Sequence, residues 1–100
     1  IMIIEQGKVY TFKLNSGEEL IGRVESQTDN TVFVQTPVSV APGPQGLGLV
    51  PSMFTADPGV SVAINMQCVA IYAPTDDSVT MKYVEATTGI KVPEKKILMG

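Results

Sequence analysis

Residues 9–24, VYTFKLNSGEELIGRV, decide the fold of this chain. In the first part of the stretch, Tyr10, Phe12 and Leu14 alternate with residues of the opposite face, which is the period of a half-buried β-strand. The Asn-Ser-Gly that follows is typical of a tight turn, because Gly17 can take a positive φ at no steric cost. The stretch therefore begins with a strand that a tight hairpin turn ends.

The second part of the stretch resumes the alternation, with a glycine in mid-strand. Leu20, Gly22 and Val24 share the core face, whereas Ile21, Arg23 and Glu25 point outward. A glycine at such a position removes a side chain from the interior and permits a sharp bend or bulge. We therefore expect one strand that bends at Gly22 and belongs to both halves of a small, tightly curled barrel.

The Pro- and Gly-rich residues 41–59 follow the third predicted strand as an insertion. They hold four prolines and four glycines, which predicts that no regular element is sustained there. The insertion also has an unusual apolar load for a loop, so it is either a flap over the domain's own core or a patch that meets another protein. The apolar residues are Leu47, Leu49, Val50, Met53 and Phe54.

The alternation in residues 60–73 changes phase near Cys68, which predicts a bulge or kink there and makes Cys68 itself a core residue. In residues 78–86, Val79, Met81 and Tyr83 share the inward face of a last strand. The predicted strands are 8–14, 19–26, 31–36 with a continuation through Val38 and Val40, 60–73 and 78–86. QTDN at 27–30 is a tight turn, and the tail 87–100 has one helical turn after Pro93. This pattern predicts a single all-β domain over residues 1–100, a small, five-stranded, strongly bent SH3-like open barrel.

Composition narrows the class of protein. A hydrophobic content of 44% in 100 residues supports one core, and no apolar run reaches the ~18 residues of a membrane span. Only 17% of residues are charged against a typical ~25%, so we expect part of the surface to be buried against other subunits. The N-terminal apolar run stops at Glu5, too short for a secretory signal, and a single cysteine suits a reducing compartment; both favour a cytoplasmic protein.

The residues of common catalytic centres are missing. With no histidine and one cysteine, the chain has no zinc site of the usual type, no Cys-His pair and no Ser-His-Asp triad. GPQGLG lacks the Lys-Ser/Thr of a phosphate loop. The adjacent acids Glu18 and Glu19, and Asp76 and Asp77, lie in or beside predicted turns and are interpreted as solvated. We therefore expect no enzyme, no cofactor and no metal.

The stretch 9–24 closely resembles the first Sm motif: alternating apolar residues, Asn-x-Gly at the hairpin, then Glu-Leu-x-Gly-x-Val. The resemblance extends over 9–38 and more loosely over 60–86, and small Sm-like proteins of marine phages look similar. It implies a homo-oligomeric ring of about five to eight subunits, in which strand 4 of one subunit pairs with strand 5 of the next. It also implies that single-stranded RNA, or DNA, binds at the turns after strands 2 and 4, in the host cytoplasm if the protein is phage-encoded.

Carried onto this chain, the resemblance places the two binding turns at 27–30 and 72–77. Ile71, Tyr72 and Ala73 stand where the second Sm motif has Ile-Arg-Gly. Tyr72 offers a face for base stacking, and Asn30 offers hydrogen bonds. The expected nucleic-acid-binding residues are Gln27, Thr28, Asp29, Asn30, Tyr72, Ala73, Pro74, Thr75, Arg23 and Lys82, with Lys13, Lys91, Lys95 and Lys96 as further phosphate contacts.

Two classes of function stay open. The first is a ring that binds nucleic acid and acts in RNA or DNA processing, which the match to the first motif favours. The second is a structural or protein-interaction ring that docks a partner through the apolar residues 47–54. The net charge of -3 and the missing arginine favour the second, since proteins that hold nucleic acid on a broad electrostatic face are usually basic.

Overall fold

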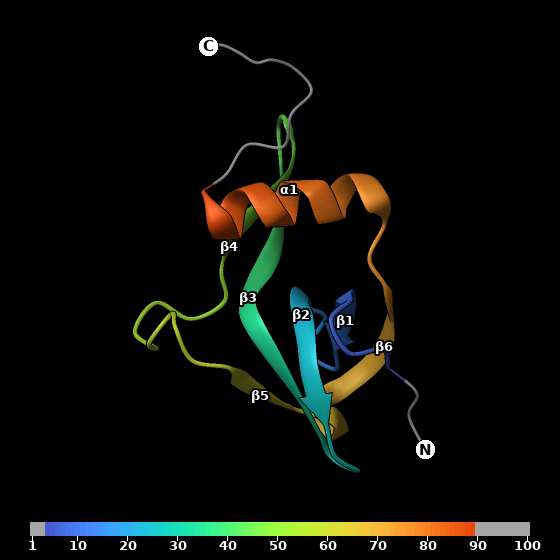
Figure 1. Cartoon of the computed structure of the whole chain (residues 1–100). Helices are drawn as coiled ribbons and strands as arrows, with labels where there is room; N and C mark the ends of the chain where they lie inside the picture. Colours follow the sequence, from blue (N-terminus) through green and yellow to red (C-terminus); the bar gives the residue numbers. More distant parts are fainter. Residues whose placement is uncertain (1–3, 90–100) are drawn as a thin grey trace.

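The computed structural model describes residues 4–89, which form a curled antiparallel sheet with one helix lying across it (Figure 1). In chain order the elements are β1 (Val9–Leu14), β2 (Glu19–Gln27), β3 (Thr31–Gly43), β4 (Gly46–Pro51), β5 (Val62–Asn65), the short 3-10 helix η1 (Met66–Cys68), β6 (Val69–Pro74) and α1 (Asp77–Thr88).

The strands form an open barrel. The sheet runs in the order β4, β3, β2, β1, β6, and β5 pairs with β3 beside this path. Since η1 alone separates β5 from β6, the chain passes directly from the strand on one side of the barrel to the strand on the other. The predicted small, all-β open barrel is confirmed: residues 4–89 are mostly strand, with six strands where the sequence predicts five and with one α-helix that it does not predict.

β2 bends where the sequence places its second glycine. A Cβ on Gly22 would lie 3.0 Å from the Cβ of Val34, and the register with β3 shifts between Ile21 and Arg23. β3 bulges opposite this point, at Thr36, which has a φ of 48°. The predicted bend is confirmed, and it depends on the missing side chain. The predicted turn at Gly17 is confirmed as well, with a φ of 96°.

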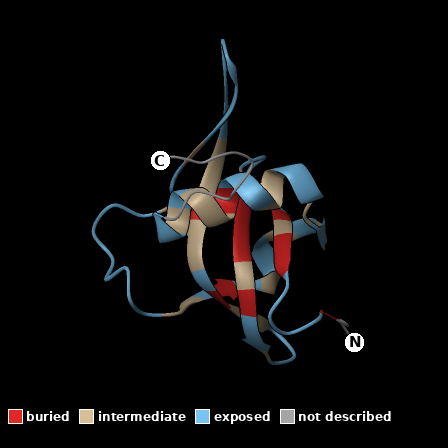
Figure 2. Ribbon diagram, turned by 45° about the horizontal axis from the view of Figure 1, so that its top comes forward, coloured by how far each residue is buried: buried red, intermediate tan, exposed pale blue. Residues whose placement is uncertain are grey.

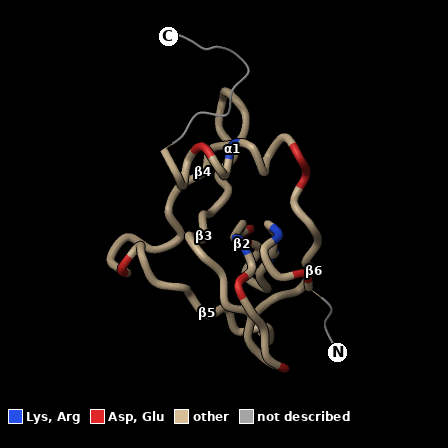
Figure 3. Tube along the Cα trace, in the orientation of Figure 1, with Lys and Arg blue, Asp and Glu red and all other residues tan. Residues whose placement is uncertain are grey.

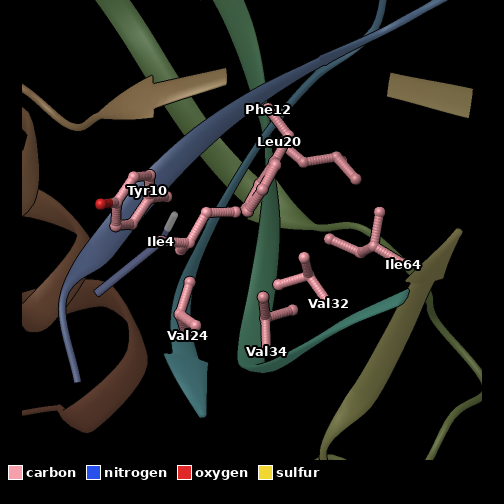
Figure 4. Close-up of a cluster of buried hydrophobic side chains, with 8 residues drawn as sticks. All are labelled: Ile4, Tyr10, Phe12, Leu20, Val24, Val32, Val34 and Ile64. Carbon is pink, nitrogen blue, oxygen red and sulfur yellow. The ribbon is translucent and has the colours of Figure 1, made fainter. Parts of the chain in front are cut away.

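The buried residues of the sheet lie mainly on its central strands (Figure 2) and form two clusters, one on each face. The inner face holds the larger cluster (Figure 4). On the outer face, Val9, Ile21 and Val38 pack against Tyr83 of α1. The prediction that Ile21 points to solvent is therefore wrong, because a helix covers it. The larger cluster consists of Ile4, Tyr10, Phe12, Leu20, Val24, Val32, Val34 and Ile64.

The last predicted strand, 78–86, is wrong, since these residues lie in α1. The Asp76 carboxylate accepts from the backbone nitrogens of Ser78 and Val79, and Gly89 ends the helix with a φ of 73°. Residues 79 and 83 share a face in a strand and in a helix alike. Met81 distinguishes a strand from a helix. A strand would bury Met81 on the same face as residues 79 and 83, whereas Met81 is 45% exposed.

The prediction of no regular element over 41–59 is also wrong in its first part. β3 continues to Gly43 and pairs with β4 from Val38↔Pro51 to Gly43↔Gly46. Pro51 lies on the edge strand β4, and Pro42 lies beyond Ser39, the last residue of β3 that pairs with β2, so each proline has an unpaired side on which a backbone donor is not needed. The glycine at position 46, with a φ of 105°, allows the tight turn. The resulting hairpin projects from the barrel beside α1 (Figures 1 and 2).

Candidate nucleic-acid interface

The predicted turn between β2 and β3 is present. The backbone nitrogen of Thr28 donates to the carbonyl of Thr31 at 2.8 Å, which closes the turn. Thr28, Asp29 and Asn30 are exposed. Gln27 is half-buried and donates from Nε2 to the carbonyl of Ile4 at 3.2 Å, so its amide holds the N-terminal segment. Of the four predicted residues in this turn, three offer their side chains to solvent.

The turn that lies beside it is η1, which follows β5. The backbone nitrogen of Met66 donates to the carbonyl of Asn30 at 2.8 Å, next to the strand pairing of Thr31 with Asn65. The Asn65 side chain accepts from the backbone nitrogen of Gln67 at 2.9 Å and so caps the short helix. The two turns are therefore held together by backbone bonds.

The β1–β2 hairpin reaches the other side of η1. Asn15 donates from its backbone to the carbonyl of Cys68 at 2.7 Å and from Nδ2 to the carbonyl of Gln67 at 3.0 Å. We call residues 15, 28–30 and 65–68 the turn surface. Its exposed side chains include four amide residues, which supply both donors and acceptors for the edges of bases. These are Asn15, Asn30, Asn65 and Gln67.

The second predicted binding turn, 72–77, lies elsewhere. Tyr72, Ala73 and Pro74 belong to β6, and Thr75 leads into α1 with its backbone nitrogen 3.0 Å from the carbonyl of Val9. Figure 1 shows this connection rising toward α1, away from the β2–β3 turn. The Tyr72 ring packs beside Phe12, with ring centroids 6.4 Å apart, against the inner core. The structure does not bring 72–75 together with 27–30.

The second turn is predicted too far along the chain, at 72–77, because the sequence is interpreted as one continuous strand over 60–73. The sequence does carry a signal for a break, since Asn65 is a favoured cap and the alternation changes phase just after it. The predicted kink near Cys68 is confirmed as η1. The prediction that Cys68 is a core residue is wrong, because a residue on this turn is exposed.

The predicted phosphate contacts within residues 4–89 lie on β1, β2 and α1, and Figure 3 shows basic positions near β2 and on α1. Arg23 is half-buried and donates from Nη1 to the carbonyl of Gly7 at 2.8 Å. Lys82 is exposed on α1, and Lys13 is exposed on β1, paired with Ile71. Residues 4–89 carry four basic and nine acidic side chains, so this part of the chain has no excess of positive charge to hold phosphates. Lys91, Lys95, Lys96 and the predicted helical turn after Pro93 lie outside the described residues.

β6 is an apolar strand at the edge of the sheet. It reads VAIYAP, and it pairs with β1 on one side, with no second partner among the described strands. Ile71 points outward and is 63% exposed. β5 likewise pairs only with β3 within residues 4–89. Exposed apolar edges of this kind favour pairing with another chain.

Residues 4–89 thus form an open β-barrel with edge strands β4, β5 and β6 and a group of exposed amide side chains around the β5–β6 link. Neither a scan against protein-family models nor a search of curated proteins found a match to this chain. Within residues 4–89, no three His, Cys, Asp or Glu side chains are grouped so as to hold a metal ion. No helix in that range is long and apolar enough to cross a membrane.

Proposed function

We propose that this protein is a ring-forming, Sm-like protein that binds single-stranded nucleic acid, RNA or DNA, and acts in its processing without being an enzyme. The observation that carries the proposal is the bond between Met66 and Asn30, at 2.8 Å, which joins the turn after β2 to the turn after β5. The resemblance to the Sm family implies binding at the turns after the second and fourth strands, and β5 is the fourth strand of the barrel when the projecting β4 is set aside.

The ring forms by pairing between the edges of neighbouring copies. β5 of one subunit offers its free edge to β6 of the next, and both edges are satisfied at every interface only when the ring closes. Burial of Ile71 adds apolar area to each interface. We propose about five to eight subunits, the range that the Sm resemblance implies. In this ring each subunit presents one turn surface, repeated around the axis.

The turn surface binds nucleic acid mainly through bases. Asn30 and Gln67 supply donors and acceptors, whereas Asp29 opposes phosphates at close range. The affinity of one surface is therefore low, and repetition around the ring raises it, because binding to the second and later surfaces is intramolecular. We expect a weaker dependence on salt than that of a protein that neutralises many phosphates.

The test is a fluorescence-anisotropy titration of a labelled single-stranded oligonucleotide, as RNA and as DNA, at two salt concentrations. The unmodified protein binds at low salt, and Gln67→Ala weakens binding at both concentrations by about the same factor, since it removes an uncharged contact. Gln35→Ala is the matched control, because Gln35 is an exposed amide on β3 whose partner is Glu25. Absence of binding by the unmodified protein, even at low salt, contradicts the proposal.

A second candidate is a structural ring that docks a protein partner through residues 47–54. The observation that favours it is the exposure of Phe54, which is 85%, together with that of Leu47, Val50 and Met53, each above 40%. An exposed apolar group of this kind marks interaction sites in many proteins. A protein that forms the ring but binds no oligonucleotide supports this second candidate.

A further inference from the structure

An apolar groove lies between the C-terminal end of α1 and the chain that joins β4 to β5. Its volume is about 220 Å³. Leu49, Met53 and Val60 line one side, and Ala86 and Thr87 of α1 line the other. None of its lining residues belongs to the turn surface, so an inference about the groove stands whether or not nucleic acid binds there.

The groove exists because β3 changes partners along one of its edges. That edge pairs with β5 up to Val34 and with β4 from Val38 onward. Between these two positions β3 bulges at Thr36, which lines the groove. The strand pairing therefore leaves a gap between β4 and β5, and the chain that joins them bows out around it (Figure 1).

Both ends of this joining chain are anchored to the barrel. Ser52 donates from Oγ to the carbonyl of Pro37 at 2.9 Å. Ser61 donates from Oγ to the carboxylate of Glu25 on β2. The groove is therefore preformed by strand topology and by these two anchors, as sites for small ligands usually are.

The walls of the groove are suited to an apolar ligand that carries a positive charge. Apart from Thr36, Asp57 and Thr87, the described residues that line it have apolar side chains. Asp57 is the only charged residue among them, and its Oδ1 accepts from the backbone nitrogen of Gly59 at 2.9 Å, which holds the carboxylate in place. A carboxylate beside an apolar surface attracts a cation and repels carboxylate and phosphate groups.

The size of the groove limits the ligand to a small molecule. An apolar cavity of ~150 Å³ holds benzene, so a volume of about 220 Å³ accommodates an aliphatic or aromatic body of roughly six to eight carbon atoms. Met53 is 47% exposed and Val60 is 57% exposed, so the walls have apolar area for such a body to cover. Removal of this area from water favours binding.

We propose that this groove binds a small hydrophobic amine. The aliphatic or aromatic body of the ligand lies among Leu49, Met53 and Val60, against Ala86 of α1, and its ammonium group lies beside the carboxylate of Asp57. The apolar body supplies most of the affinity, and the ion pair selects an amine over an alcohol or an acid of the same length.

Titration of the full-length protein with hexylamine, followed by methyl NMR, tests this. The salt concentration is about 0.15 M, at which exposed charges more than ~8 Å apart are largely screened. Butylamine, which is two methylenes shorter, and hexanol, which has no charge, are the matched controls. We expect hexylamine to shift the methyl signals of Met53, Val60 and Ala86. We expect it to bind about fifteenfold more tightly than butylamine, because each buried methylene contributes ~0.8 kcal/mol, and about two- to fivefold more tightly than hexanol, the range of an exposed ion pair.

Two variants assign the two ends of the ligand. Asp57→Asn keeps the acceptor for the backbone nitrogen of Gly59 and removes the charge, so we expect hexylamine and hexanol to bind it equally. Ala86 is exposed on α1 and lines the groove, so Ala86→Leu places a larger side chain there. We expect this variant to bind both ligands at least about tenfold more weakly, and circular dichroism checks that each variant keeps the fold.

Hexylamine that leaves the methyl signals of the groove unshifted overturns the proposal. Equal affinities for hexylamine and butylamine also overturn it, because the body of the ligand is then not buried. A preference for hexylamine over hexanol that persists in Asp57→Asn, or binding that Ala86→Leu does not weaken, shows that the ligand lies elsewhere. These titrations contain no nucleic acid, so their failure is distinct from a failure of the proposed function.

Discussion

The backbone nitrogen of Met66 donates to the carbonyl oxygen of Asn30 at 2.8 Å, and this bond joins two turns that are more than thirty residues apart in the sequence. It forms because β5 pairs with the start of β3, which brings the end of β5 to the β2–β3 turn. The position of the turn surface is therefore a consequence of strand pairing, and its amide residues are exposed.

Asn65 offers a way to separate the shape of the turn surface from its chemistry. Its side chain accepts from the backbone nitrogen of Gln67 at 2.9 Å, and an aspartate keeps that acceptor while adding a negative charge. We expect Asn65→Asp to retain the melting temperature and to weaken oligonucleotide binding, most strongly at low salt, because the new charge repels phosphates. Asn65→Ala removes the cap, so we expect it to lower both the melting temperature and the affinity for the oligonucleotide. Unchanged binding in Asn65→Asp argues against a role for this turn.

Gly22 tests the bend of β2. A methyl group there meets Val34 at 3.0 Å, so we expect Gly22→Val to lower the free energy of unfolding by about 1–3 kcal/mol. Gly43→Ala is the control, since a Cβ there comes no closer than 3.6 Å to another atom and the φ is not positive. Denaturant unfolding measures both. Equal stability of the two variants contradicts the account of the bend.

The hydroxyl of Tyr83 ties α1 to the sheet. It donates to the carbonyl of Gln35 at 2.7 Å and accepts from the backbone nitrogen of Arg23 at 3.2 Å, and the residue is buried. Removal of a hydroxyl that satisfies two partly buried backbone groups costs about 1–3 kcal/mol, so we expect Tyr83→Phe to lose up to that amount of stability. Tyr72→Phe, in which the ring stays against Phe12, serves as the control for loss of a hydroxyl.

Tyr83 also makes the stability of the protein depend on pH. Burial raises the pKa of Tyr83 above its usual value of 10.0, although the bond from Arg23 opposes the shift. The folded state therefore favours the neutral phenol, and this contribution is complete below the unfolded pKa and lost as the pH rises through the folded pKa. We expect the stability of the unmodified protein to fall above pH ~10 more steeply than that of Tyr83→Phe. Parallel curves for the two proteins contradict this assignment.

Prediction from the sequence succeeds where local chemistry and packing agree. The hairpin at Gly17, the bend at Gly22 and the turn at 27–30 are all set by residues that tolerate or require those backbone conformations. The prediction of a strand over 78–86 fails because a spacing of four residues places Val79 and Tyr83 on one face in a strand and in a helix alike. The Asp76 cap and Gly89 mark the helix, and this capping signal outweighs the alternation.

The remaining errors have a common physical origin in tertiary pairing. The hairpin of β3 and β4 forms from a Pro- and Gly-rich sequence because one of its strands lies at an edge, where local propensity matters less. The second turn of the candidate site is set by the pairing of β5 with β3 and of β6 with β1, which no single segment reveals. The sequence therefore identifies the turn after β2, whereas it predicts the next turn at 72–77, where the structure has the end of β6 and the start of α1.

The β6 edge tests the proposed assembly. Ile71 is 63% exposed, so Ile71→Lys should change the stability of one subunit by less than about 0.5 kcal/mol, whereas a charge on an edge strand opposes pairing with another chain. We expect this variant to sediment as smaller species than the unmodified protein. Met81→Lys is the matched control, an exposed apolar residue on α1 at 45% exposure. A similar effect of both substitutions argues against β6 as the interface.

The most direct test of the central claim is the mass of the complex with a single-stranded oligonucleotide, measured at low salt by size-exclusion chromatography with light scattering and absorbance at two wavelengths. These signals give the protein mass and the nucleic-acid mass in one peak. We predict a single species of about five to eight subunits that carries the oligonucleotide, because closed edge pairing repeats the turn surface around one axis. A monomer at micromolar concentration, or an oligomer whose peak contains no nucleic acid, contradicts the account.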